Sequence, residues 1–160
     1  MKRVLFICIH NSARSQMAEE YLRLLAPDRF EPESAGMEPT TINPLVIEAM
    51  REEGIELLGK KTRSVFELFK QGRLFHYVIT VCSESVEEKC PLFPGVTHRM
   101  HLPFPDPATF TGTHEEKLTQ VREVRDAIKA TIQEFIDWDA PGGEKPLGRT
   151  WDLNPAQPVE

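Results

Sequence analysis

The chain has 160 residues, which is the length of a single domain, and 40% of them are hydrophobic, as is usual for a globular protein. Its 19 basic and 25 acidic residues give a formal net charge of -6, which argues against a protein that binds nucleic acid or a membrane surface through a basic patch. The apolar run Val4–Ile9 is too short for a membrane span or a secretory signal, so we expect a cytoplasmic protein.

The start of the chain predicts a buried strand, a helix and an edge strand. Val4–Ile7 is a continuous apolar run, typical of a parallel strand that is buried on both faces. A helical apolar stripe follows a polar loop, ends before Pro27 and consists of Met17, Tyr21, Leu24 and Leu25. Residues 29–35 suit a strand, but Pro32 has no backbone N–H to donate, so this strand is predicted at an edge of the sheet.

Two further helices are predicted from the residues at their ends. Asn43–Pro44 combines an N-cap with a first-turn proline, and Gly54 suits the end of that helix. Ser64 and Glu67 have the spacing of a capping box that opens a short helix, which Gly72 closes.

The second half of the chain predicts two more strands and a long last helix. Residues 75–81 form a second buried-type strand, and residues 96–102 form a weaker one. Thr113 and Glu116 again have capping-box spacing, and the helix that they open has an apolar face made of Leu118, Val121, Val124, Ile128, Ile132, Phe135 and Ile136. The order of these elements predicts an α/β fold, an open four-stranded parallel sheet flanked by helices.

This pattern ends at Asp139, beyond which prolines and glycines leave little apolar surface to bury. We predict one α/β domain over residues 1–138 and a Pro/Gly-rich tail over residues 139–160, with Trp151 as the tail's only anchor.

Cys8 ends the first strand, and a polar loop joins that strand to the first helix. In an open parallel sheet such a junction lies at the carboxyl end of the strands, beside a helix N-terminus, where anions bind. The positive potential there favours the nucleophilic thiolate form of Cys8, and the planar guanidinium group of Arg14 can hold two oxygens of an anion. We therefore predict an oxyanion-binding loop made of Ile9, His10, Asn11, Ser12, Ala13, Arg14 and Ser15.

Alternatives for single residues of this loop stay open. Cys8 also suits a small buried core position, although that role does not explain an arginine six residues later. Ser15 can donate a hydrogen bond to the sulfur or cap the helix. His10 is assigned no role beyond shaping the loop.

The arrangement Cys-x5-Arg-Ser between the first strand and the first helix, with Asn11 inside it, resembles the low-molecular-weight protein tyrosine phosphatase superfamily. Gln16 makes the chain most similar to the thioredoxin-coupled arsenate reductases of that superfamily, because a proline there would mark the phosphatases. Further matches lie at Ser34-Ala35-Gly36, Asn43-Pro44, Val81-Cys82, Cys90-Pro91 and Phe104-Pro105-Asp106-Pro107. The resemblance covers residues 1–138 and implies a sheet layered as in flavodoxin.

The resemblance implies that Asp106 is a general acid and that Cys8, Cys82 and Cys90 form a disulfide relay. By itself, Asp106 before Pro107 is just as typical of a turn. Cys82 follows a strand as Cys8 does, so the two thiols meet at one sheet edge if their strands are parallel neighbours. Were the segment from Cys82 to Cys90 helical, their α-carbons would lie about 12 Å apart, beyond the roughly 7 Å limit for a disulfide, so that segment would have to unwind.

The implied reaction is the reduction of arsenate to arsenite, with no bound cofactor and with thioredoxin and an arsenate or phosphate oxyanion as partners of a monomer. Cys8 attacks arsenic, Cys82 then attacks Cys8 and releases arsenite, and Cys90 draws the disulfide away for thioredoxin to reduce. The alternative is a tyrosine phosphatase, which needs only Cys8, Arg14 and Asp106 because water resolves its intermediate. Against that alternative, Ala108–Thr109 stands where phosphatases of the family usually carry aromatic residues.

A non-enzymatic alternative is a metal-binding or anion-sensing module built from Cys82, Cys90, His98 and His101. Its two histidines would point to opposite faces of a strand, and its cysteine spacing is unusual for zinc. Some reductases of the family bind potassium behind the loop, and Asn11, Glu19 and Ser34 match those ligands. Arg63–Ser64 stands where an acidic ligand is expected, so we predict no metal site.

Overall fold

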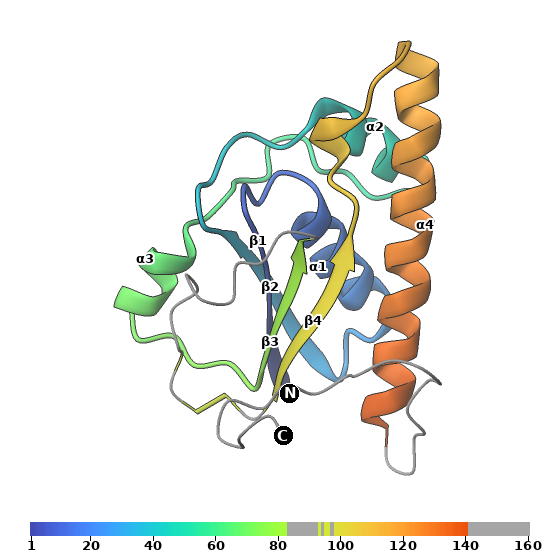
Figure 1. Cartoon of the computed structure of the whole chain (residues 1–160). Helices are drawn as coiled ribbons and strands as arrows, with labels where there is room; N and C mark the ends of the chain where they lie inside the picture. The colour runs from blue at the N-terminus through green and yellow to red at the C-terminus, as the bar shows by residue number, and fades with distance from the viewer. Residues whose placement is uncertain (83–92, 94, 97, 141–160) are drawn as a thin grey trace, which may run out of the picture.

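The computed structural model describes residues 1–82, 93, 95–96 and 98–140, and Figure 1 shows its arrangement. Within these residues one sheet contains the strands β1 (Lys2–Cys8), β2 (Phe30–Gly36), β3 (Tyr77–Cys82) and β4 (His98–Phe104). Its helices are α1 (Arg14–Leu25), α2 (Pro44–Arg51), α3 (Val65–Lys70), the 3-10 turn η1 (Pro107–Thr109) and α4 (His114–Asp139). Cys90, the segment between Cys82 and Cys90, and the predicted tail beyond Ala140 lie outside the described residues.

The strands pair in parallel in the order β2-β1-β3-β4, which confirms the predicted four-stranded open sheet. β1 lies in the middle, and its residues from Val4 to Cys8 are buried, as their unbroken apolar run predicts. β2 lies at an edge, where the missing N–H of Pro32 costs no ladder hydrogen bond.

Helices cover both faces of the sheet. The larger core cluster lies between the sheet and α1, α2 and α4, and it includes Val4, Phe6 and Cys8 of β1. The smaller cluster joins Leu5 and Ile7 on the opposite face of β1 to α3. In Figure 1, α3 and α4 accordingly lie on opposite sides of the sheet. Within the described residues, no helix combines the length and the apolar character needed to cross a membrane.

The helix ends follow local sequence signals with one difference. Asn43 caps α2 by accepting from the amide of Leu45, and Thr113 opens α4 with both hydrogen bonds of a capping box. Ser64 caps α3 by accepting from the amide of Phe66, not through the Ser64–Glu67 pair that the spacing predicted.

Two further sequence-based details are wrong. Leu24, expected on the buried stripe of α1, is 55% exposed, and Leu22, two residues earlier and so on the other side of the helix, is buried instead. β4 runs to Phe104, two residues beyond its predicted end at Leu102, and so includes Pro103. A proline is tolerated there because β4 is the other edge strand.

Candidate active site

The parallel strands bring their carboxyl ends, and the residues that follow them, to one edge of the sheet. The register places Cys8 of β1 opposite Gly36 of β2, and Cys82 of β3 opposite Phe104 of β4. Asp106 lies two residues beyond the end of β4. Cys8, Cys82 and Asp106 therefore lie at the same edge of the sheet, where ligand sites form in open α/β sheets.

The loop after Cys8 turns its carbonyl groups outward. Residues 37–43 donate backbone hydrogen bonds of 2.7–3.1 Å to the carbonyls of Cys8, Ile9, His10 and Ser12. The amides of Ser12, Ala13 and Ser15, by contrast, have no acceptor among the described residues, although Ala13 and Ser15 are buried. Buried amides seldom stay unpaired in proteins, so this inward set is suited to the oxygens of an anion at the α1 N-terminus.

The Cys8 sulfur contacts two hydrogen-bonding groups of the loop. The backbone amide of Asn11 donates to Sγ at 3.2 Å, and the Ser15 hydroxyl lies 2.9 Å from it. Asn11 Nδ2 donates to the Ser15 Oγ at 2.8 Å, which leaves the proton of Ser15 available for the sulfur. A Cys8 thiolate has no proton to donate, so in that form the sulfur accepts from both groups.

Asn11 is the residue that fixes this geometry. Its φ of 53° is left-handed, a conformation that asparagine tolerates better than most residues. Its Oδ1 accepts from the backbone amide of Arg63 at 2.9 Å and from Gln16 Nε2 at 3.1 Å. The backbone amide can only donate, so Oδ1 must face it and Nδ2 must face Ser15. Sequence reasoning assigned no role to Gln16 or to the backbone of Arg63.

Gly36 lets β2 approach the loop closely. A Cβ atom at this position would lie 2.7 Å from the Asn11 nitrogen and 2.8 Å from the Ile9 oxygen, both backbone atoms that cannot move aside freely. The sequence match Ser34-Ala35-Gly36 contains this glycine, but no local pattern indicates why it is needed.

Arg14 and Asp106 face each other over the loop. Arg14 is 2% exposed, and its NH1 donates to the carbonyl of Phe104 at 3.2 Å. Its NH2 lies 3.6 Å from Asp106 Oδ2, while Asp106 Oδ1 accepts from the Ala108 amide and caps η1. Asp106 therefore both forms the turn and lies beside Arg14.

Cys82 is buried at the end of β3, beside Cys8 and in the same core cluster. Ile7 pairs with Thr80, so Cys82 is offset by one residue from the position opposite Cys8. A strand spacing near 4.8 Å and a rise near 3.3 Å place the two α-carbons about 6 Å apart, within the range of disulfides. The register between β3 and β4 shifts between Thr80 and Cys82, which breaks simple alternation of side chains here.

The residues of the metal-binding alternative are dispersed in the described part of the chain. His98 stacks on the Tyr77 ring at 5.1 Å, near the start of β3. The Nδ1 of His101 lies 2.7 Å from the Thr80 hydroxyl, farther along the sheet. Because the two histidines contact different side chains at different positions, they do not form one ligand set with Cys82.

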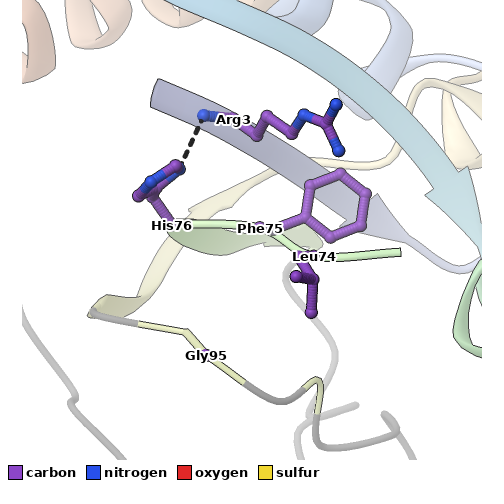
Figure 2. A pocket seen from close by; sticks show the side chains of 5 residues that line it. All are labelled: Arg3, Leu74, Phe75, His76 and Gly95. Carbon is purple, nitrogen blue, oxygen red and sulfur yellow. Dashed lines mark hydrogen bonds between the residues drawn. The ribbon is translucent and has the colours of Figure 1, made fainter. Parts of the chain in front are cut away.

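A separate hollow of about 290 Å³ lies at the opposite, amino-terminal end of the strands and is lined by Arg3, Leu74, Phe75, His76 and Gly95 (Figure 2). His76 Nδ1 accepts from the Arg3 backbone amide at 3.0 Å, the hydrogen bond drawn as a dashed line in Figure 2. The hollow is remote from Cys8 along β1, so we assign it no part in the chemistry.

Comparisons with known proteins place the chain among arsenate reductases and phosphatases of similar sequence and fold. An arsenate reductase from Shouchella clausii (strain KSM-K16) is 37% identical over 137 residues, which are 85% of this chain and 96% of that protein. A solved arsenate reductase in the phosphate binding state superposes with a TM-score of 0.65 at 26% identity, covering 85% of this chain and 97% of the other. The thioredoxin-dependent arsenate reductase of Corynebacterium glutamicum gives 0.56 at 28% identity, covering 83% and 62%. The family model of low molecular weight phosphotyrosine protein phosphatases matches residues 3–142, and the chain belongs to that family.

Proposed function

We propose that the protein reduces arsenate to arsenite with Cys8, Cys82 and Cys90 as a disulfide relay that thioredoxin regenerates. The observation that carries the proposal is the second buried thiol, Cys82, beside Cys8 at the same sheet edge. A phosphatase that uses water has no need of it. The relatives with 37% identity that bear the name arsenate reductase support the same choice.

The loop supports the first step. Arsenate is held by the unpaired loop amides and by Arg14, the Cys8 thiolate attacks arsenic, and a hydroxyl group of arsenate leaves as water after Asp106 protonates it. Arginine and the α1 N-terminus offset the negative charge that the anion brings. The product is a covalent bond between the Cys8 sulfur and arsenic(V).

The next steps move electrons from sulfur to arsenic. Cys82, as a thiolate, attacks the Cys8 sulfur, the electron pair of the sulfur–arsenic bond passes to arsenic, and arsenite leaves as arsenic(III). Cys90 then attacks the Cys82 sulfur of the Cys8–Cys82 disulfide and frees the Cys8 thiolate. Thioredoxin supplies the two electrons that reduce the Cys82–Cys90 disulfide. This cycle requires a reducing compartment, which supports a place in the cytoplasm.

Tryptic mass spectrometry after one arsenate turnover tests the relay sharply, because the three cysteines fall on three different tryptic peptides, residues 4–14, 74–89 and 90–99. We expect peptides 74–89 and 90–99 joined by a disulfide in the wild type. In Cys90→Ser, the relay stops one step earlier and peptides 4–14 and 74–89 are joined. Three free thiols after arsenite release would refute the relay.

The site also supports a second activity, the hydrolysis of aryl phosphates. That reaction needs only Cys8, Arg14 and Asp106, and the chain belongs to a phosphatase family. Thioredoxin-coupled, arsenate-dependent NADPH oxidation and aryl-phosphate hydrolysis are compared on the same preparation. We expect Cys82→Ser to abolish repeated arsenate turnover while hydrolysis persists. Sustained arsenate turnover in Cys82→Ser would contradict the assignment of the second thiol.

A further inference from the structure

Glu19 is a buried carboxylate behind the anion-binding loop. It is 2% exposed, on the second turn of α1. Burial alone raises the pKa of a carboxyl group, but the charge and hydrogen bond of Lys60, together with a hydrogen bond from Ser34, outweigh it and hold the pKa of Glu19 below its ordinary value. Glu19 is therefore ionised, and a buried ionised carboxylate requires a cation.

Lys60 supplies that cation. Its Nζ lies 2.5 Å from Glu19 Oε2 and 2.6 Å from Glu20 Oε1, so the ammonium group bridges two carboxylates of α1. The Ser34 hydroxyl donates to the other oxygen of Glu19 at 2.7 Å. Arg23 adds a more exposed ion pair to Glu19 at 3.0 Å. The Lys60 side chain itself is only 22% exposed.

This ion pair anchors the segment between α2 and α3, which contacts the anion-binding loop. Lys60 lies between α2 and α3, three residues before Arg63. In the same segment, the Arg63 amide donates to Asn11, the Lys61 carbonyl accepts from Gln16 Nε2 at 3.5 Å, and the Arg63 carbonyl accepts from the Gly36 amide at 2.8 Å. Asn11 in turn orients Ser15 toward the Cys8 sulfur. The Lys60–Glu19 contact thus stands at the start of a continuous set of contacts that ends at the nucleophile.

The same side chains leave no fit for a bound alkali cation. Asn11, Glu19 and Ser34 match potassium ligands of some relatives, but the oxygens of Glu19 are engaged by Lys60 and Ser34. Arg23 and Arg63 add two further positive charges, 3.0 Å and 3.9 Å from oxygens of Glu19. A potassium ion against Glu19 would meet three cationic side chains of the protein and is repelled.

We propose that Lys60 is a positioning residue, whose ammonium group takes the place of a bound monovalent cation behind the anion-binding loop and holds Asn11 and Ser15 in register around Cys8. The inference rests on the proposed oxyanion site but not on arsenate turnover. The protein's affinity for oxyanions should then be indifferent to the alkali cation in solution. Removing the ammonium group should create a dependence on that cation.

The proposal is tested by measuring how well inorganic phosphate protects Cys8 from iodoacetamide, with alkylation read on tryptic peptide 4–14. The measurement is made at constant ionic strength in potassium, sodium or choline chloride. Wild-type phosphate affinity and alkylation rate should agree within about twofold in the three salts. In choline chloride, Lys60→Ala should lose about tenfold in affinity, since the buried Glu19 carboxylate loses its closest cation. Potassium should restore much of that loss because it fits the vacated space between Glu19 and Glu20.

One further variant keeps the volume of the Lys60 side chain without its charge, and another removes a positive charge elsewhere. Lys60→Met fills the space with an unbranched neutral side chain, so it should lose affinity without recovery in potassium. Lys70→Ala removes a positive charge on α3 whose side chain is 73% exposed, outside the contacts that lead to the loop, and should behave as wild type in all salts.

Several results would overturn the proposal. Potassium-specific tightening of wild-type phosphate binding by more than about threefold would show a cation site beside Lys60, and this measurement needs no variant to fold. Folded Lys60→Met with wild-type affinity and alkylation rate, or Lys60→Ala that responds equally to potassium and choline, would also refute it. If phosphate fails to protect wild-type Cys8, the oxyanion site itself is wrong, whereas the alkylation rates still report on Lys60.

Discussion

Replacing Ser15 with alanine removes one of the two donors that hold the Cys8 sulfur. The Ser15 hydroxyl lies 2.9 Å from Sγ, and it donates to the sulfur when Cys8 is a thiolate, because a thiolate can only accept. A hydrogen bond to a charged group contributes about 1.5–3 kcal/mol, which corresponds to about 10- to 150-fold in rate. We expect kcat/KM of Ser15→Ala to fall by that factor, measured both by arsenate-dependent NADPH oxidation and by aryl-phosphate hydrolysis.

A matched variant distinguishes the lost hydrogen bond from a disturbed fold. Ser15→Thr keeps the hydroxyl but adds a methyl group at a fully buried position, so it should retain more activity than Ser15→Ala even if it is less stable. Circular dichroism and thermal unfolding check that both variants fold. If folded Ser15→Ala keeps kcat/KM within about threefold of wild type, the hydroxyl does not stabilise the nucleophile.

Three other substitutions follow from the same geometry. Gly36→Ala places a Cβ against loop backbone atoms, so calorimetry should show a loss of about 1–3 kcal/mol in stability together with weaker phosphate binding; an unchanged melting temperature would contradict the packing. Asp106→Asn should lower kcat about 100- to 10,000-fold, whereas phosphate affinity measured by isothermal titration should be kept, and an equal loss in both would argue against a general acid. The pKa of Glu19 lies below its ordinary value of 4.5, so its contribution to stability is present above about pH 4.5 and lost as the pH falls through the lower folded pKa. Glu19→Gln should therefore flatten the fall in stability between pH 5 and 3, roughly the range of carboxyl titration, in urea unfolding, and an acid limb identical to wild type would exclude this role.

Sequence reasoning succeeded where the deciding interaction is local. The unbroken apolar run of β1 and the Thr113–Glu116 capping box each lie within a few residues, and the structure contains both. The extension of β4 through Pro103 was missed because tolerance of a proline depends on which strand lies at the edge. Which strand lies at the edge is a property of the whole sheet, and the sequence of the β4 segment alone does not reveal it.

The site divides in the same way. Cys8, Asn11, Arg14 and Ser15 lie within eight residues of one another in the sequence. Their spacing alone therefore predicts an anion-binding loop. The groups that support the loop come from distant segments, and no local pattern marks them. Gly36 matters because β2 pairs with β1, and Lys60 matters because its segment meets α1. Such residues become visible only once the chain's pairings are known.

The net charge of -6 and the preference of the site for an anion are reconciled by distance. Screening reduces the effect of surface carboxylates beyond roughly 10 Å, whereas the loop amides, the α1 N-terminus and Arg14 act at hydrogen-bond range. The buried negative charge closest behind the loop is Glu19, and Lys60 neutralises it in direct contact. Without that ammonium group, Glu19 would keep only its more exposed partners Arg23 and Arg63, and its less compensated charge would oppose both an arriving oxyanion and the Cys8 thiolate. A protein of this overall charge therefore binds an anion by arranging cations close to the loop and not by changing its composition.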